Sequence, residues 1–220
     1  MRTLAPRPKI TLKIATSLDG RIGTSSGESQ WITGPEARMQ GHRLRNESDA
    51  VLVGVETVLA DDPRLTVRLP EGETGARDPL RVVLDSRLRT PSFARLARPG
   101  TLIITTRDPA TAAEIGGVEI ARVAGDAQNR PTIPAVLALL SDRGVKSLMI
   151  EGGGRVAACF VAAGVIDAIE WFRAPILLGG DGRPGVAALS LARLVNAPRF
   201  RRLAVEPLGD DLWERYERLP

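Results

Sequence analysis

The pattern of apolar and polar positions predicts a chain in which short strands alternate with helices. Residues 9–16 alternate between apolar and polar side chains, which is typical of a β-strand. Several apolar runs are too short for a globular helix and therefore predict buried strands. These runs lie at residues 50–54, 80–85, 101–105, 118–123, 147–150 and 166–172.

The intervening segments carry helix signals. The stretch Thr33-Gly34-Pro35-Glu36 combines a cap, a first-turn proline and an early acid, and it predicts a helix that runs to about Asn46. Further helical segments are expected at residues 55–60, 134–143 and 156–163, and residues 70–79 are expected to form a polar surface loop. Two last runs, 200–207 and 212–218, predict a closing hairpin around Gly209-Asp210.

This order of elements predicts an α/β fold in one domain, residues 1–220. Strands that alternate with helices favour a mostly parallel sheet with helices on both faces, and the closing hairpin makes the sheet mixed, with an antiparallel edge. The length of 220 residues suits one large domain with a substantial core.

Composition and charge narrow the range of ligands and cofactors that the chain is expected to bind. The net charge of +4 is dispersed, which suits a phosphorylated ligand better than a nucleic acid. One cysteine excludes an internal disulfide, and one histidine makes a metal site improbable, so no metal is expected. No apolar segment has the length of a signal peptide or a membrane span, so we expect a soluble cytoplasmic protein with no membrane partner.

The first candidate for chemistry is the glycine turn Glu151-Gly152-Gly153-Gly154. It lies between a predicted strand and a predicted helix, where bare backbone N–H groups and the helix dipole favour an anion. The turn therefore predicts a phosphate site with Glu151 at its rim, although glycines that serve packing alone would give the same pattern.

Three other stretches could also bind a ligand. Residues 16–23 open a glycine turn at a strand end, which suits the mouth of a crevice or an ordinary turn. In residues 27–33, Trp31 could stack on a planar ring or pin the loop to the core. In residues 56–68, arginines could clamp a phosphate together with Arg45, or could be solvated surface charges. We interpret His42 as a surface or capping residue and Cys159 as a small core residue.

Familiar catalytic patterns do not fit. The lone histidine has no evident partners for a Ser-His-Asp set, and the glycine run has neither P-loop nor Rossmann spacing. A crevice with phosphate-binding features and few acid–base groups favours hydride transfer, because a bound cofactor then donates the hydride and the protein only orients the reactants.

Taken together, these stretches resemble the reductase domain of the bifunctional riboflavin-biosynthesis deaminase–reductase, from about Pro8 to the closing hairpin. The matching blocks are Ser17-Leu18-Asp19-Gly20-Arg21, residues 27–33, residues 59–63 with 65–68, Glu151-Gly152-Gly153, and residues 174–180. The resemblance implies a dihydrofolate-reductase-like fold, NADPH as the cofactor, and a homodimer. It implies reduction of 5-amino-6-(5-phosphoribosylamino)uracil to the ribitylamino product.

The resemblance also assigns roles to individual positions. Cofactor contacts fall on Ala15, Trp31, Thr57, Asp61, Ser86, Gly153, Gly154, Arg155, Val156, Ala157, Ala158 and Cys159. Substrate contacts fall on Ser29, Arg45, Leu65, Arg68 and Glu151. Arg45 and Arg68 suit the ribose 5-phosphate, and Asp61 is the first candidate for the catalytic proton donor, with ordered water as the alternative.

One departure from the family pattern limits the prediction. The family's deaminase half holds zinc with His and Cys, whereas this chain has one of each, far apart. We therefore expect no deaminase activity and a separate deaminase that supplies the substrate. The alternatives are a reductase of the undeaminated diaminopyrimidine, a dihydrofolate reductase-like paralogue, and a non-catalytic nucleotide- or nucleic-acid-binding protein.

Overall fold

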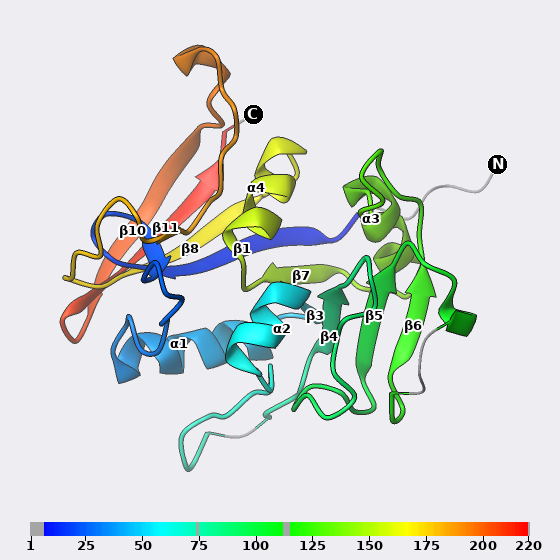
Figure 1. The fold of residues 1–220 in the computed structure, drawn as a ribbon. Coiled ribbons are helices and arrows are strands. Elements are labelled where there is room, and N and C mark those ends of the chain that lie inside the picture. Colours follow the sequence, from blue (N-terminus) through cyan, green and yellow to red (C-terminus); the bar gives the residue numbers. More distant parts are fainter. Residues whose placement is uncertain (1–6, 74, 112–114, 220) are drawn as a thin grey trace.

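A computed structural model describes residues 7–73, 75–111 and 115–219, and it shows one mixed sheet of nine strands (Figure 1). The strand order is β10-β11-β8-β1-β7-β3-β4-β5-β6. Seven strands from β8 to β6 run parallel, and β11 and β10 continue the sheet as an antiparallel hairpin. The predicted mixed sheet with an antiparallel edge is therefore confirmed.

The bounds of the elements agree closely with the sequence pattern. The sheet consists of β1 (Lys9–Thr16), β3 (Ala50–Gly54), β4 (Leu80–Leu84), β5 (Thr101–Thr105), β6 (Glu119–Arg122), β7 (Ser147–Ile150), β8 (Ala168–Arg173), β10 (Phe200–Leu208) and β11 (Asp211–Arg218). The helices are α1 (Pro35–Asn46), α2 (Val55–Asp61), α3 (Ile133–Asp142) and α4 (Gly154–Ala162), with short 3₁₀ turns η1 (Pro109–Thr111) and η2 (Leu194–Asn196). The pattern missed a small ribbon of β2 (Arg21–Gly23) and β9 (Arg183–Pro184), whose strands are too short to show a periodicity.

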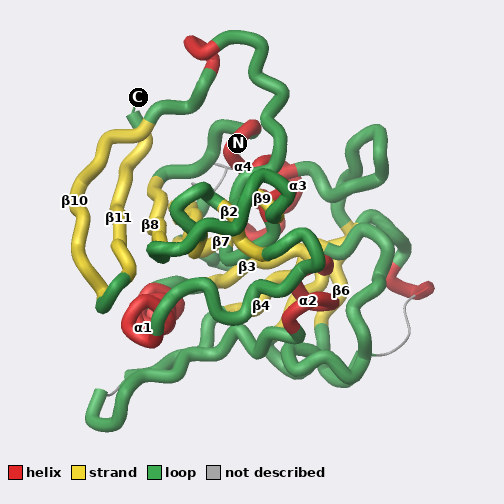
Figure 2. The backbone as a smooth tube through the Cα atoms, turned by 60° about the vertical axis from the view of Figure 1, so that its left-hand side comes forward, coloured by secondary structure: helices red, strands yellow, loops and turns green. Residues whose placement is uncertain are grey.

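Helices cover both faces of the sheet, as predicted. In Figures 1 and 2, α3 and α4 lie on one face, and α1 and α2 lie on the other. Each face has its own apolar core: Phe160 of α4 packs with alternate residues such as Leu12 and Ile150, and Val58 of α2 packs with Val53 and the neighbouring positions. Central strands such as β3 are buried on both faces, which explains their unbroken apolar runs.

Tertiary contacts fix the ends of the helices and loops around one edge of the sheet. Asp211, at the start of β11, accepts a hydrogen bond from the backbone N–H of Gly34 at 2.6 Å, so the hairpin caps α1. Asp19 accepts hydrogen bonds from the Ser17 hydroxyl and from the N–H groups of Leu178 and Gly179. These bonds, the Ser17 bond foremost, lower the pKa of Asp19 to about 2. In the described part of the chain, no helix has the length and apolarity needed to cross a membrane.

Candidate active site

The residue that follows β7 holds a buried ion pair at the carboxyl end of the sheet. Glu151 receives two hydrogen bonds from the Arg45 guanidinium on α1, one of them at 2.6 Å between Nη2 and Oε2. The Glu151 side chain is 6% exposed and that of Arg45 is 17% exposed. Burial, the largest single cause, would raise the pKa of Glu151, but the charge and the hydrogen bonds of Arg45, together with the Lys13 charge, hold this pKa below its usual range.

Lys13 of β1 is a third charged group in this cluster, and the sequence pattern did not single it out. Its ammonium lies 5.5 Å from the centre of the Phe172 ring, and Gly41 of α1 lies against its side chain. Burial lowers the pKa of Lys13, while the Glu151 carboxylate opposes this change. The face of β1 that carries Lys13 is partly buried, and here it lies against α1, so Lys13 faces the cluster and not open solvent.

His42 connects this ion pair to the loop that follows α2. The interpretation of His42 as a surface or capping residue is wrong. His42 belongs to α1, is 9% exposed, and turns its ring toward the loop that follows α2. Its Nδ1 is 3.2 Å from the carbonyl oxygen of Thr66, and its Nε2 is 3.3 Å from Nη2 of Arg68. The structure thus brings Arg45, Glu151 and Arg68 into one cluster, through a histidine that the sequence argument set aside.

The two arginines of the cluster differ in their partners. Arg45 is bound to Glu151, whereas no carboxylate among the described residues lies within ion-pair distance of Arg68, which is exposed. Leu65, which the resemblance assigned to the substrate, is 3% exposed and packs in the core under α2. Its buried side chain anchors the loop that presents Arg68.

The glycine turn after β7 forms a backbone cradle against α2. Gly153 has φ +79°, a conformation that favours glycine, and it is the N-cap of α4, with no side-chain cap on the helix. A Cβ at Gly152 would lie 3.1 Å from Oγ1 of Thr57, so the two segments approach closely. The first N–H groups of α4 lack partners within the helix, which suits an anion.

The remaining positions of α4 have different environments. Gly154 accepts a hydrogen bond from Ala187 through its carbonyl at 2.9 Å, so the segment after β9 lies over the turn. Ala157 and Ala158 are buried in the core, Val156 is partly buried, and Arg155 is exposed. The interpretation of Cys159 as a core residue is wrong, because its position on the 3.6-residue period turns it outward and it is exposed.

Further assigned residues lie in the loop before α1 and at the end of α2. The Ser29 hydroxyl donates a hydrogen bond to Oδ1 of Asp61 at 2.8 Å. The Trp31 ring is 69% exposed, with the Arg38 guanidinium 4.7 Å from its centre, so the ring does not pin the loop to the core. An exposed indole plane remains available for stacking.

The last two assigned residues lie on strand ends. Ala15 is on β1 two residues beyond Lys13 and therefore on the same face of the strand. Ser86 follows β4, and its carbonyl accepts a 3.4 Å hydrogen bond from Thr106. In the described part of the chain, no hydrogen bond or ion pair connects either of them to the charged cluster, although both lie at the carboxyl ends of parallel strands, where α/β sheets bind ligands.

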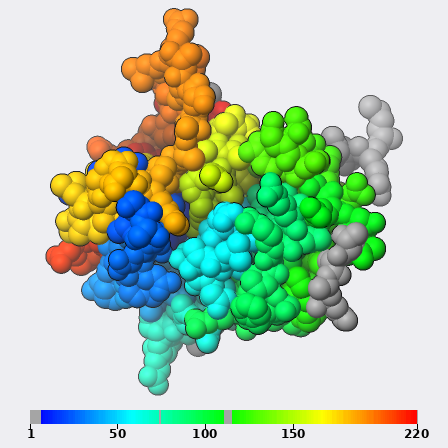
Figure 3. Space-filling view, viewed as in Figure 1, coloured from blue at the N-terminus to red at the C-terminus, as the bar shows by residue number. Residues whose placement is uncertain are grey.

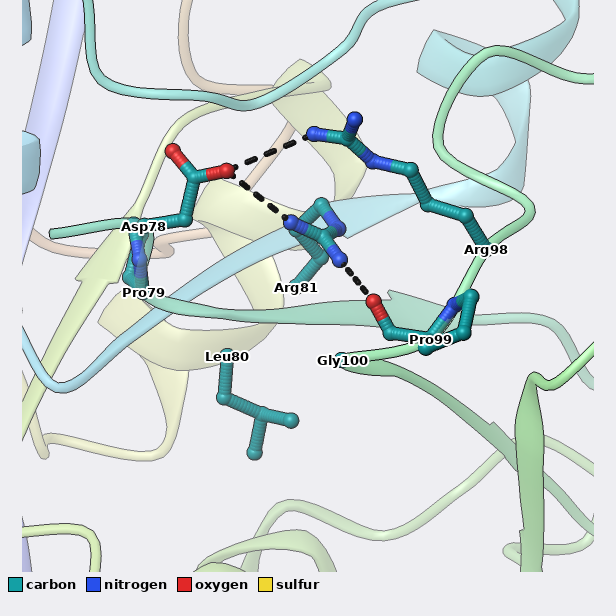
Figure 4. A pocket seen from close by; sticks show the side chains of 7 residues that line it. All are labelled: Asp78, Pro79, Leu80, Arg81, Arg98, Pro99 and Gly100. Carbon is teal, nitrogen blue, oxygen red and sulfur yellow. Dashed lines mark hydrogen bonds and ion pairs between the residues drawn. The ribbon is translucent and has the colours of Figure 1, made fainter.

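A second arginine cluster lies at the opposite edge, beside a cavity of about 330 Å³ at the amino ends of β4 and β5 (Figure 4). Arg81 donates from Nε to Thr101 Oγ1 at 2.9 Å and from Nη2 to the Pro99 carbonyl. Its Nη1 lies 3.6 Å from Asp78, which also pairs with Arg98 at 3.4 Å. Arg81 is 3% exposed, and all three of its nitrogens have protein partners.

Comparison with known proteins decides the family. The family described as the RibD C-terminal domain matches residues 8–213. The chain belongs to the RibD C-terminal domain family. The resemblance inferred from the sequence motifs is thereby confirmed.

Relatives of this RibD C-terminal domain cover nearly all of the chain. The riboflavin biosynthesis protein RibD of Mycobacterium tuberculosis is 39% identical over 207 residues, which are 93% of this chain and 53% of that protein. The 2,5-diamino-6-ribosylamino-4(3H)-pyrimidinone 5′-phosphate reductase of Archaeoglobus fulgidus is 38% identical over 188 residues, 82% of this chain and 86% of that protein. The chain thus spans about half the length of the RibD relatives and most of the archaeal reductase.

Solved structures confirm the fold of the RibD C-terminal domain. Acinetobacter baumannii RibD superimposes with a TM-score of 0.86 at 31% identity, covering 97% of this chain and 59% of that one. The yeast riboflavin biosynthesis reductase Rib7 has a TM-score of 0.73 at 20% identity, covering 97% and 90% of the two chains, and supports the fold alone.

Proposed function

We propose that this chain catalyses the NADPH-dependent reduction of 5-amino-6-(5-phosphoribosylamino)uracil to the ribitylamino product of riboflavin biosynthesis. The observation that carries the proposal is the cluster in which a buried carboxylate, Glu151, lies with the guanidinium of Arg68, which pairs with no carboxylate of the described residues. A phosphorylated sugar needs both a cation for its phosphate and an acceptor for its hydroxyl groups. The family membership and the relatives named as reductases of this pathway support the same reaction.

The residues present fit a dinucleotide cofactor. The backbone cradle at Gly153 and the uncapped N-terminus of α4 suit the phosphates, and Arg155 adds an exposed cation. Thr57 lies beside the turn, and the exposed Trp31 ring suits a planar base. Buried Ala157 and Ala158 would contribute through the helix backbone and not through their side chains.

The residues of the chain would orient the substrate and supply a proton. When bound, the cofactor supplies a hydride to C1′ of the ring-opened sugar. Arg68 would hold the 5-phosphate, because the charge of Arg45 is already balanced by Glu151. Glu151 would accept a hydrogen bond from the ligand while Arg45 keeps it ionised. Asp61, oriented by Ser29, stays the first candidate for the proton donor, and the Lys13 ammonium is a second.

A second candidate substrate is the undeaminated diaminopyrimidine. The archaeal relative at 38% identity is named as a reductase of that compound, and the chain covers 86% of its length. We favour the uracil, because a Thermotoga maritima protein that is 29% identical to this chain is named as a deaminase and a reductase of the uracil compound. A deamination step would then precede the reduction.

The test is an assay of NADPH oxidation with the two pyrimidines and dihydrofolate, side by side. Turnover of the uracil at least about ten times faster than of the other two supports the proposal. Faster turnover of the diaminopyrimidine would reverse the order of the two steps, and no turnover of either would overturn the proposal. NADH in place of NADPH tests the cofactor preference. Binding of a polynucleotide without NADPH consumption would favour the non-catalytic alternative.

We also propose a homodimer that forms through β10 and through the segment that precedes it, residues 185–199, which we call the arm. The arm projects from the body in Figures 1 and 3, and Leu194 is 84% and Val195 66% exposed. Leu203 and Val205 are 56% and 43% exposed and lie on β10, which pairs with β11 on one side and ends the sheet of the described residues on the other. An apolar surface continuous with a strand edge is suited to association.

Light scattering should give the mass of a dimer for the parent protein and for the control Phe93→Asp, and that of a monomer for Leu203→Asp. A monomeric parent protein would contradict this proposal.

A further inference from the structure

His42 lies between two guanidinium groups of the candidate site. Its Nε2 is 3.3 Å from Nη2 of Arg68, and its Nδ1 is 3.4 Å from Nη1 of Arg45. Nδ1 is also 3.2 Å from the Thr66 carbonyl oxygen and 3.3 Å from the backbone nitrogen of Arg68. The imidazole thus contacts both the side chain and the backbone of the segment that presents Arg68.

The position of the imidazole proton determines which hydrogen bonds the ring makes. A guanidinium has donors only, so an Nε2 that bonds to Arg68 is an unprotonated acceptor, and the proton then lies on Nδ1 and points at the Thr66 carbonyl. This tautomer gives up the hydrogen bond that the Arg68 backbone N–H donates to an unprotonated Nδ1. The opposite tautomer keeps that bond, but it points the Nε2–H at the Arg68 guanidinium, so the position of the proton decides whether His42 holds the side chain or the backbone of Arg68.

The charges around His42 keep the ring neutral. Burial, then Arg45 and Arg68, lower the pKa of His42 to about 4, and the Glu151 carboxylate opposes this only weakly. A protonated ring would be a third cation between two guanidiniums. Near neutral pH, His42 therefore offers Arg68 a hydrogen-bond acceptor that carries no charge.

A neutral acceptor at this position can orient Arg68 without cancelling its charge. Arg68 is exposed, and a long arginine side chain that is not held loses rotamer entropy when a ligand fixes it. A carboxylate would hold the guanidinium equally well, but it would cancel the charge that attracts a phosphate, as Glu151 does for Arg45.

We propose that His42 is a positioning residue: its Nε2 holds the Arg68 guanidinium in place for the substrate phosphate without neutralising it. This inference rests on the proposed function for its activity assays, but its spectroscopic test is independent of turnover. In this proposal His42 acts through Arg68.

Two substitutions separate the two nitrogens of the ring. Gln in His42→Gln can place an acceptor near Nε2, whereas Asn in His42→Asn can keep only the donor near Nδ1. We expect His42→Asn to raise the KM for the phosphoribosylamino-pyrimidine about 10-fold and His42→Gln about threefold or less, because a hydrogen bond to a charged group is lost only in the former. The KM for NADPH should change less than about twofold in both variants. Equal effects of both substitutions, or a matching rise in the KM for NADPH, would overturn the proposal.

A double-mutant cycle tests whether His42 acts through Arg68. In an Arg68→Ala background, His42→Asn should change the substrate KM by less than about twofold, because the group that it positions is gone. A purely structural histidine would give the same factor in both backgrounds, and additive effects would reject the positioning role.

The histidine also gives a test that needs no activity, because the chain contains one. A ¹H–¹⁵N spectrum of the imidazole should show the Nδ1–H tautomer at neutral pH, and Arg68→Ala should shift the Nε2 resonance. Ribose 5-phosphate is the probe that should shift Nε2 in the parent protein and not in the Arg68→Ala variant. An Nε2–H tautomer would refute the proposal. An enzyme without turnover but with the expected spectrum would contradict the proposed function alone.

Discussion

Two arginine clusters lie at opposite edges of the same parallel sheet and show two uses of a guanidinium. At the amino ends of β4 and β5, Arg81 is 3% exposed, and its nitrogens bind Thr101, the Pro99 carbonyl and Asp78. At the carboxyl edge, Arg68 is exposed and has His42 as its side-chain partner among the described residues. An arginine whose donors all have protein partners stabilises the fold, whereas one that is oriented but not neutralised is available to a ligand.

Arg45 lies between these extremes, and it shows why burial alone does not distinguish them. It is as well paired as Arg81, but its partner is Glu151, which lies beside the glycine turn. A buried ion pair of this kind contributes little net stability, yet removing one partner is costly, since a charge stays buried without compensation. The comparison therefore predicts different outcomes for single and double substitutions.

The largest effect is expected at Glu151. Glu151→Gln leaves Arg45 and Lys13 without their counter-charge, and it should lower the free energy of unfolding by about 3 kcal/mol and abolish turnover. Urea denaturation and the NADPH assay measure the two effects. The double variant Arg45→Met/Glu151→Leu should recover part of the stability and no activity, because apolar side chains can replace a buried ion pair while Lys13 stays without its counter-charge. Recovery of activity would show that the pair is structural, like the Arg81 cluster.

Arg81→Met should be the next largest change, and it should affect stability only. It leaves the Pro99 carbonyl and the Thr101 hydroxyl without their donors and Asp78 with Arg98 alone, so we expect a loss of about 2–3 kcal/mol in the free energy of unfolding. The substrate and NADPH constants, measured well below the melting temperature, should stay within about twofold of the parent values. A selective rise in either constant would mean that the two edges of the sheet are coupled.

Arg68→Ala should weaken substrate binding and leave stability unchanged, the opposite of Arg81→Met. The substrate KM should rise about 30-fold, because a charge-assisted contact to phosphate is lost, while the melting temperature stays unchanged. Arg64→Ala is the matched control, since Arg64 lies in the same exposed loop and has no contact with His42 in the described part of the chain. An equal effect at both positions would indicate general attraction by the loop, and an unchanged KM would remove the phosphate role of Arg68.

The pH dependence of stability tests the neutral state of His42. Because its pKa of about 4 is below the ordinary value of 6.5, the unfolded chain binds the proton more readily, and stability falls as the pH falls through the window between these values. Between about pH 7 and pH 5, His42 should account for a loss of about 2 kcal/mol that the His42→Gln variant lacks. Urea midpoints of both proteins across this range give the difference, and parallel curves would contradict the lowered pKa.

The sequence allowed the sheet to be predicted but not this cluster. Strand and helix positions followed from short apolar runs and from signals such as Pro35, because these depend on local chemistry. His42 and Lys13 escaped because their partners are distant in sequence: Arg68 is 26 residues from His42, and Glu151 is brought to Lys13 only by the pairing of β1 with β7. Lys13 gave no signal, because a polar residue at its position fits the alternation of an ordinary strand, and His42 gave none, because α1 is polar over most of its length.

The smallest effect is expected at Asp78, which belongs to both halves of the comparison. Its Oδ2 pairs with Arg81 and Arg98, while its Oδ1 accepts a 2.8 Å hydrogen bond from the backbone N–H of Val67, next to Arg68. Asp78→Asn can keep the bond to Val67 and should lower stability by less than about 1 kcal/mol with the substrate KM unchanged. Asp78→Ala loses that bond as well, so the KM should rise about threefold as the loop loosens. If both variants change the KM equally, the charge of Asp78 acts on the site, and the two arginine clusters form one electrostatic system.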